Sequence, residues 1–174
     1  EVRKIRRLYE EFGLKAVGTF PAGCTPQVPI DHARWYPIYS VCAELGIPIF
    51  ICAGIPGPRV TSMCQHVELL DIVCYDFPEL KIIGIHVGIP WTDEMIAMAW
   101  KHPNVFIGTD AHSPKYWPES FVKYINTYGQ DKVIFGTDFP VLEFQRTREE
   151  IESLNLRAEP KRKLLRDNVL RIYG

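Results

Sequence analysis

Five short apolar runs, rich in β-branched residues, alternate along the chain with segments of helical pattern. The runs cover residues 16–20, 47–52, 82–86, 105–110 and 133–138. Because nearly every residue in them is apolar, they predict strands covered on both faces, as in parallel sheets. Helices are expected at residues 2–12, 33–45, 63–76, 92–101, 118–128, 146–154 and 160–172. This alternation, without a linker, predicts one α/β domain over residues 1–174.

Two architectures produce such an alternation. A doubly wound sheet usually carries a glycine-rich phosphate loop after its first strand, but residues 21–26 match neither the dinucleotide nor the P-loop pattern. A (β/α)8 barrel instead places its chemistry at the carboxyl ends of several strands, and a complete one needs about 250 residues. The 174 residues here supply five units. They favour an incomplete (β/α)8 TIM barrel, with about three units outside these residues.

Three of the apolar runs end in the same way, with a glycine, one further residue, and then a side chain able to do chemistry. They read Gly84-Ile85-His86, Gly108-Thr109-Asp110 and Gly136-Thr137-Asp138. On a strand the residues at i and i+2 share a face, so each glycine is expected to leave room beneath the residue that follows it. The pattern predicts one wall of an active site, built from three strand ends.

The residue types at these ends allow two chemistries. His86 and Asp138 suit a divalent metal, whose bound water becomes a nucleophile. Without a metal, His86 would act as a general base that Asp138 orients. Asp110 is interpreted as a pocket-wall or turn residue.

Other residues near the strand ends are candidates to contact a substrate. Trp91 is placed to stack on a substrate ring, and His112 to line the same mouth. Cys52 ends the strand before that of His86 and is expected to face the mouth as well. With Asp110, these residues form the expected substrate-binding set.

Composition narrows the range of partners. Lys and Arg number 20 against 21 Asp and Glu, which gives no electrostatic reason to expect nucleic acid or an anionic membrane. No apolar run approaches the roughly 20 residues that span a bilayer. Five cysteines without a Cys-x-x-Cys pair predict a reduced, cytoplasmic protein. We expect a small-molecule substrate. The sequence does not specify the oligomeric state, although exposed sheet edges would favour a homo-oligomer.

The order of several motifs resembles the amidohydrolase-2 family, typified by aminocarboxymuconate-semialdehyde decarboxylase. They are Tyr36-Pro37-Ile38-Tyr39, Asp76-Phe77-Pro78-Glu79-Leu80, His86-Val87-Gly88, Pro90-Trp91-Thr92-Asp93-Glu94, His102-Pro103-Asn104-Val105, Phe135-Gly136-Thr137-Asp138-Phe139-Pro140 and Leu165-Arg166-Asp167-Asn168-Val169-Leu170. The match runs from about Val17 to the C-terminus and would correspond to barrel strands 4 to 8.

The resemblance implies a metal-dependent hydrolase or decarboxylase acting on a small carboxylated or aromatic substrate. Asp138 is similar to the family's strand-8 metal ligand, and His86 to its strand-6 catalytic acid/base. The implied cofactor is a divalent metal, zinc or alternatively manganese. The chain departs from the family in lacking the strand-1 ligand pair and in having Cys52, not a histidine, at the strand-5 position. A non-catalytic barrel remnant or interaction scaffold is the alternative.

Overall fold

Five parallel strands form one sheet in the computed structural model, which describes residues 1–174. They are β1 (Val17–Thr19), β2 (Ile49–Cys52), β3 (Ile82–Ile85), β4 (Val105–Gly108) and β5 (Val133–Ile134). Their order across the sheet is the order along the chain. A doubly wound sheet reverses its strand order at a switch point, whereas this sheet never does. The doubly wound alternative is therefore wrong, and the α/β fold with a parallel sheet of the barrel type is confirmed.

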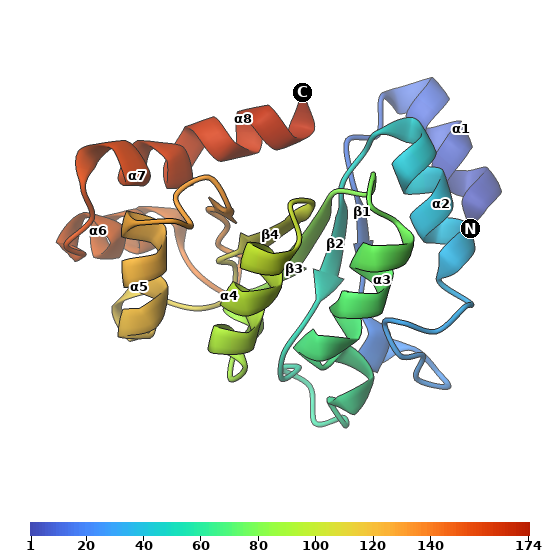
Figure 1. The fold of residues 1–174 in the computed structure, drawn as a ribbon, viewed down its shortest axis with the longest axis horizontal. Coiled ribbons are helices and arrows are strands. Elements are labelled where there is room, and N and C mark those ends of the chain that lie inside the picture. The colour runs from blue at the N-terminus through green and yellow to red at the C-terminus, as the bar shows by residue number, and fades with distance from the viewer.

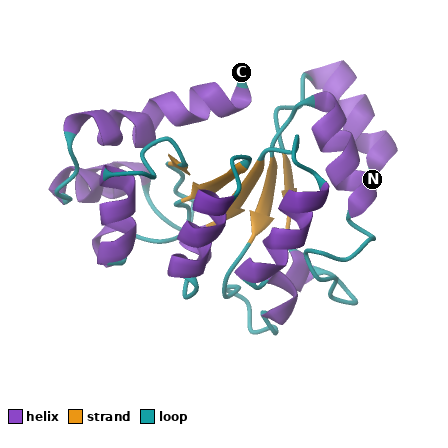
Figure 2. Ribbon diagram, viewed as in Figure 1, coloured by secondary structure: helices purple, strands orange, loops and turns teal.

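Helices connect the strands and cover one face of the sheet, except that the last helix packs on the opposite face. They are α1 (Val2–Phe12), α2 (Tyr36–Leu45), α3 (Leu70–Asp76), α4 (Thr92–Lys101), α5 (Glu119–Asn126), α6 (Phe144–Ser153), α7 (Ala158–Arg162) and α8 (Asn168–Tyr173). Figure 1 shows α3 and α4 in front of the strands, and Figure 2 shows the strands fanning out behind this helical layer. None of these helices has the length and apolar character needed to cross a membrane.

Several element bounds differ from those expected. Two short 3₁₀ turns precede α3 where a helix over 63–76 was predicted, and a π-helical turn (Lys163–Asp167) interrupts the helix predicted over 160–172. The strand predicted over 133–138 ends at Ile134. Asp138 adopts a left-handed backbone with φ of 55°, a conformation that no strand contains. Residues 135–138 are therefore not part of a strand, and Phe135, Gly136 and Asp138 line a hollow beside it.

The main core lies between the sheet and the helices. It contains 29 buried residues, among them alternate strand residues such as Ile49, Ile82 and Ile107, which are fully buried. The aromatic side chains of Tyr39 and Phe121 reach it from α2 and α5. Alternation along each strand places the intervening residues on the opposite face.

The opposite face of the sheet carries a second, smaller cluster. Ile83, Phe106 and Ile134 pack there against Ile172 of α8. The Lys81 Nζ, at the start of β3, donates a hydrogen bond of 2.8 Å to the carbonyl oxygen of Ile172. Helix α8 therefore covers this inner face toward the amino ends of the strands, away from their carboxyl ends.

This arrangement predicts unequal effects of two substitutions in α8. Ile172 is 1% exposed and Leu170 is 54% exposed. Ile172→Ala is expected to lower the free energy of unfolding by about 2–4 kcal/mol, because it opens a cavity against the inner face. Leu170→Ala, the matched control, is expected to change it by at most about 0.5 kcal/mol. Urea denaturation measures both, and equal losses would contradict the assigned packing of α8.

Candidate active site at the carboxyl ends of the strands

A pocket of about 550 Å³ opens at the carboxyl ends of β2 and β3. Its polar lining includes Cys52, His86, His112 and Asp138, and its apolar lining includes Phe20, Ile55, Pro56 and Val141. These residues come from segments spread over most of the chain. Parallel strands joined by helical crossovers bring their carboxyl ends to one edge, which is where ligands bind in α/β folds.

The central contact of the site is the pair formed by His86 and Asp110. The Nδ1 of His86 lies 3.0 Å from the Oδ2 of Asp110, and the two side chains are 20% and 16% exposed. Asp110 lies behind the imidazole ring, in an adjoining hollow of about 340 Å³ on the inner face of the sheet. Because the carboxylate accepts the hydrogen bond from Nδ1–H, the other ring nitrogen is left to act in the pocket.

Cys52 completes a row of three side chains. Its Sγ lies 3.6 Å from the Nε2 of His86, on the side of the ring opposite Asp110. Cys52 is the last residue of β2 and pairs in register with Ile85, directly before His86. The thiol, the imidazole and the carboxylate therefore follow one another across neighbouring strand ends.

Two of the three predicted glycines make room for the same aspartate. A Cβ atom on Gly108 would lie 2.7 Å from the Oδ1 of Asp110, and one on Gly136 would lie 3.3 Å from the Cβ of Asp110. The Thr109 hydroxyl accepts a hydrogen bond of 3.1 Å from the Gly136 amide, which joins the two segments. The predicted role of Gly108 is thus confirmed, while Gly136 serves the neighbouring Asp110.

The third glycine does not lie beneath its histidine, so this prediction was wrong. A Cβ on Gly84 would point to the outer layer and overlap the Cε of Met95 in α4. Strand alternation ends before His86, because His86 and Val87 have left-handed backbones with φ of 66° and 58°. This turn, and not the strand, directs the imidazole into the pocket.

Left-handed backbone is concentrated at this edge of the sheet. The four non-glycine residues with positive φ are His86, Val87, Ala111 and Asp138, and three of them line the pocket. Each such conformation costs of order 1–3 kcal/mol and is typical of active sites. The clustering at the carboxyl ends of the strands supports a functional site there.

The surroundings shift the two pocket histidines in opposite directions. Burial lowers the pKa of His86, but the hydrogen bonds to Asp110 and Cys52 outweigh it and raise the pKa to about 10. Burial, followed by the nearby charge of His86, lowers the pKa of His112 below its ordinary value. Their ring centroids are 6.4 Å apart. At neutral pH the site therefore holds one protonated and one neutral imidazole.

Of the other predicted site residues, Asp138 lies at the pocket and Trp91 does not. Asp138 is exposed and lines both the pocket and the adjoining hollow, but it is Asp110 that holds the His86 ring. The alternative in which Asp138 orients His86 is therefore wrong. Trp91 packs on His66, with ring centroids 4.1 Å apart, and is not among the residues that line the pocket. The structure thus does not bring Trp91 to the substrate mouth.

The side chains present do not form a metal site by themselves. No group of three or more His, Cys, Asp or Glu residues lies close enough to hold a metal ion. A tight divalent site in a protein takes three or four such ligands. The residues of this chain alone therefore do not fit the divalent ion that the resemblance implies, and we assign no chemical step to one.

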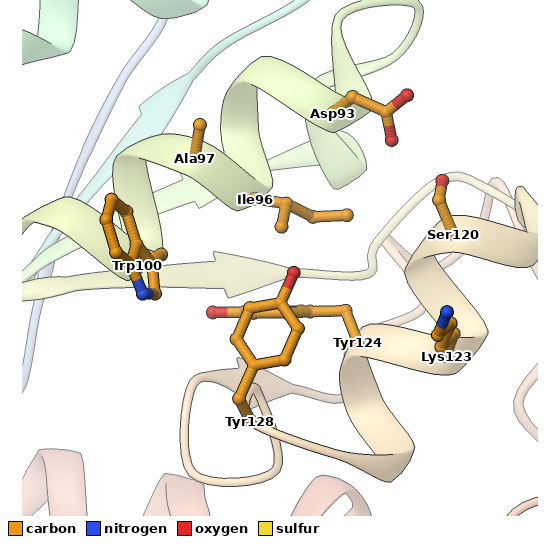
Figure 3. Close-up of a pocket in the computed structure, with 8 residues that line it drawn as sticks. All are labelled: Asp93, Ile96, Ala97, Trp100, Ser120, Lys123, Tyr124 and Tyr128. Carbon is orange, nitrogen blue, oxygen red and sulfur yellow. The ribbon is translucent and has the colours of Figure 1, made fainter.

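A second hollow lies outside the sheet, between α4 and α5. It measures about 540 Å³ and is drawn in Figure 3, where the rings of Trp100, Tyr124 and Tyr128 surround Ile96. Its polar lining consists of Asp93, Ser120 and Lys123. Since it contains no histidine or cysteine and lies away from the strand ends, the mouth pocket is the candidate site.

Comparison with known proteins identifies the family of the chain. A family model described as Amidohydrolase matches residues 1–174. The chain therefore belongs to the amidohydrolase-2 family, as the order of its motifs predicted.

Solved structures show the same fold. An uncharacterised TIM-barrel protein from Bordetella bronchiseptica superimposes with a TM-score of 0.88 at 25% identity, covering 98% of this chain and 60% of that one. A 4-oxalomesaconate hydratase from Rhodopseudomonas palustris gives 0.69 at 22%, covering 99% and 60%. A dihydroxybenzoic acid decarboxylase from Polaromonas with bound manganese gives 0.72 at 17%, covering 99% and 64%. The chain thus spans less than two thirds of the length of these proteins.

The His86–Asp110 pair predicts a pH-dependent stability. Because the folded-state pKa of His86 is raised to about 10 from an ordinary value of about 6.5, the pair stabilises the fold fully below about pH 6.5 and loses this effect as pH rises through 10. Asp110→Asn is expected to lower the His86 pKa by NMR titration and to reduce stability at pH 6 more than at pH 10.5. An unchanged His86 titration would contradict the pairing, and Asp138→Asn is the matched control.

The glycine beneath Asp110 gives a second prediction. Gly108→Ala is expected to push the Asp110 carboxylate away from His86 and so to lower the pKa of His86, because the new Cβ would meet Oδ1. Gly18→Ala is the control, since a Cβ at Gly18 in β1 meets nothing within 4 Å. NMR titration of His86 separates the two, and equal titration curves would show that Gly108 has no such role.

Proposed function

We propose that this chain forms strands 4 to 8 of an amidohydrolase (β/α)8 barrel, whose other strands lie outside residues 1–174. The strictly sequential order of the five parallel strands supports this, as does a match to 60% of a TIM-barrel protein. The inner face supports it as well, because Gly18 and Phe20 of the β1 segment are exposed, whereas barrel strands bury such positions.

We further propose that the site carries out hydrolysis or decarboxylation of a small carboxylated or aromatic substrate. The observation that carries this proposal is the His86–Asp110 pair in the mouth pocket. The apolar side chains of Phe20, Ile55 and Val141 suit the body of an aromatic substrate. A structurally similar protein is a decarboxylase of dihydroxybenzoic acid, and another is a 4-oxalomesaconate hydratase.

In this mechanism His86 holds and moves the proton. Its raised pKa keeps the imidazole protonated at neutral pH, which suits a general acid. Asp110 fixes the ring through Nδ1, so that Nε2 delivers the proton into the pocket. In decarboxylation the proton would go to the carbon that loses the carboxylate, and in hydrolysis to the departing oxygen or nitrogen.

We propose that Asp138 contributes one carboxylate ligand to a divalent metal, zinc or manganese, whose remaining ligands come from outside residues 1–174. The position of Asp138 on the rim shared by the pocket and the adjoining hollow supports this. In the chain extended by the missing strands, Asp138→Ala is expected to lower bound metal, measured by mass spectrometry of the purified protein. Unchanged metal content would overturn this role.

The proton-carrying role is tested by His86→Gln in the same extended chain. With a panel of dihydroxybenzoates and aryl esters, the variant is expected to lose about 10²–10⁴-fold in kcat/KM, because the glutamine amide does not take up and release a proton. His32→Gln is the matched control, since His32 is exposed and only accepts a hydrogen bond from the Arg34 amide. Wild-type activity in His86→Gln would contradict the proposal. An inactive wild type would favour a non-catalytic scaffold.

A further inference from the structure

We propose that Cys52 is a nucleophile of this site, activated by His86 and positioned for attack on the carbonyl carbon of a small ester or amide. This inference rests on the proposed function only in using His86 as the proton carrier. It goes beyond that function in assigning a covalent step, and in naming the substrate class as an acyl compound.

The geometry of the row of three side chains carries the proposal. Asp110 accepts from one nitrogen of the His86 ring at 3.0 Å, and the thiol of Cys52 lies 3.6 Å from the other nitrogen. A nucleophile in reach of a base that a third group orients is the arrangement found in thiol and serine hydrolases on unrelated folds. The three residues come from the ends of three adjacent strands, so the sheet itself holds them in order.

Cys52 differs from the other cysteines of the chain. Cys42 and Cys74 are buried in the main core, and burial raises the pKa of each thiol to about 12. Burial also raises the pKa of Cys64. Cys24 donates its S–H to the carbonyl oxygen of Phe20. Among the cysteines, Cys52 alone lines the mouth pocket and contacts a histidine. A substrate in the pocket can therefore reach its thiol, and His86 can hold the thiol proton.

The pocket defines the acyl group. Phe20, Ile55 and Pro56 give the pocket an apolar wall, which suits an aromatic or short aliphatic acyl chain.

The proposed reaction needs only the chain, its substrate and one water molecule, and no oxidant or reductant. The Sγ of Cys52 reacts as a thiolate paired with the imidazolium of His86, which carries the proton on Nε2; the S–C bond forms, and the bond from the carbonyl carbon to oxygen or nitrogen breaks. The alcohol or amine leaves with the proton from His86. Water then attacks the thioester, its proton returns through His86, and the carboxylic acid and the free thiol are released. Asp110 holds the His86 ring in place through Nδ1–H throughout.

Alkylation of the chain by iodoacetamide at pH 7 tests the activation of Cys52 without any substrate. Peptide mass spectrometry follows Cys52 and, as an internal control, Cys24 in the same molecules. Both His86→Gln and Asp110→Asn are expected to slow alkylation of Cys52 by about tenfold, because an unassisted thiol is only a few per cent thiolate at this pH. The rate at Cys24 is expected to stay constant, which also shows that the variants remain folded. Equal Cys52 rates in wild type and both variants would overturn the proposal.

Acyl transfer is tested by p-nitrophenyl benzoate on the wild-type chain. A burst of nitrophenolate and a benzoyl group on the peptide that contains Cys52 are expected. Cys52→Ser is expected to lose both, and Cys24→Ser to keep both. Absence of a benzoyl group on Cys52 would contradict the proposal that Cys52 is the nucleophile.

The roles proposed for Cys52 as nucleophile and for His86 as proton carrier can be refuted independently of each other. Loss of turnover in His86→Gln without any acylation of Cys52 would refute the nucleophile and leave the proton carrier. Acylation of Cys52 with unchanged turnover in His86→Gln would refute the proton carrier.

Discussion

The parallel register of β2, β3 and β4 is the constraint on which the site depends. Cys52 pairs with Ile85, and Gly84 pairs with Ile107, so the three strands end at nearly the same height. A register shift of one residue would turn every inward side chain outward. The imidazole of His86 would then meet neither the carboxylate of Asp110 nor the thiol of Cys52. The chemistry of the pocket is thus a consequence of backbone hydrogen bonding deep in the core.

Space is the second requirement of the site, and glycine provides it. Asp110 occupies volume that side chains at Gly108 and Gly136 would otherwise fill. The carboxylate can therefore lie behind the His86 ring, on the inner face of the sheet, and its side chain is only 16% exposed. In this position it acts on the imidazole across 3.0 Å with little competition from water.

Part of the site follows from the sequence. The residues that end three of the apolar runs, His86, Asp110 and Asp138, lie at the carboxyl edge of the sheet, because strand ends can be located from hydrophobic patterning. Which of them would pair was not predictable. A glycine at a strand end indicates that space is available there, but it does not indicate which neighbouring side chain occupies that space. Gly136 was assigned to Asp138, while the structure gives its space to Asp110.

The sequence by itself determined the alternation of strands and helices, the parallel sheet and the membership of the amidohydrolase-2 family, because these depend on local pattern and on motif order. Only the tertiary structure decided that His86 turns into the pocket through a left-handed backbone, that Trp91 packs on His66 away from it, and that Asp110 and Cys52 lie on opposite sides of one imidazole. The physical reason is that the contacts of His86 with Asp110 and Cys52 join residues 24 and 34 positions apart. Such contacts are set by register and packing between strands, which no short stretch of sequence encodes.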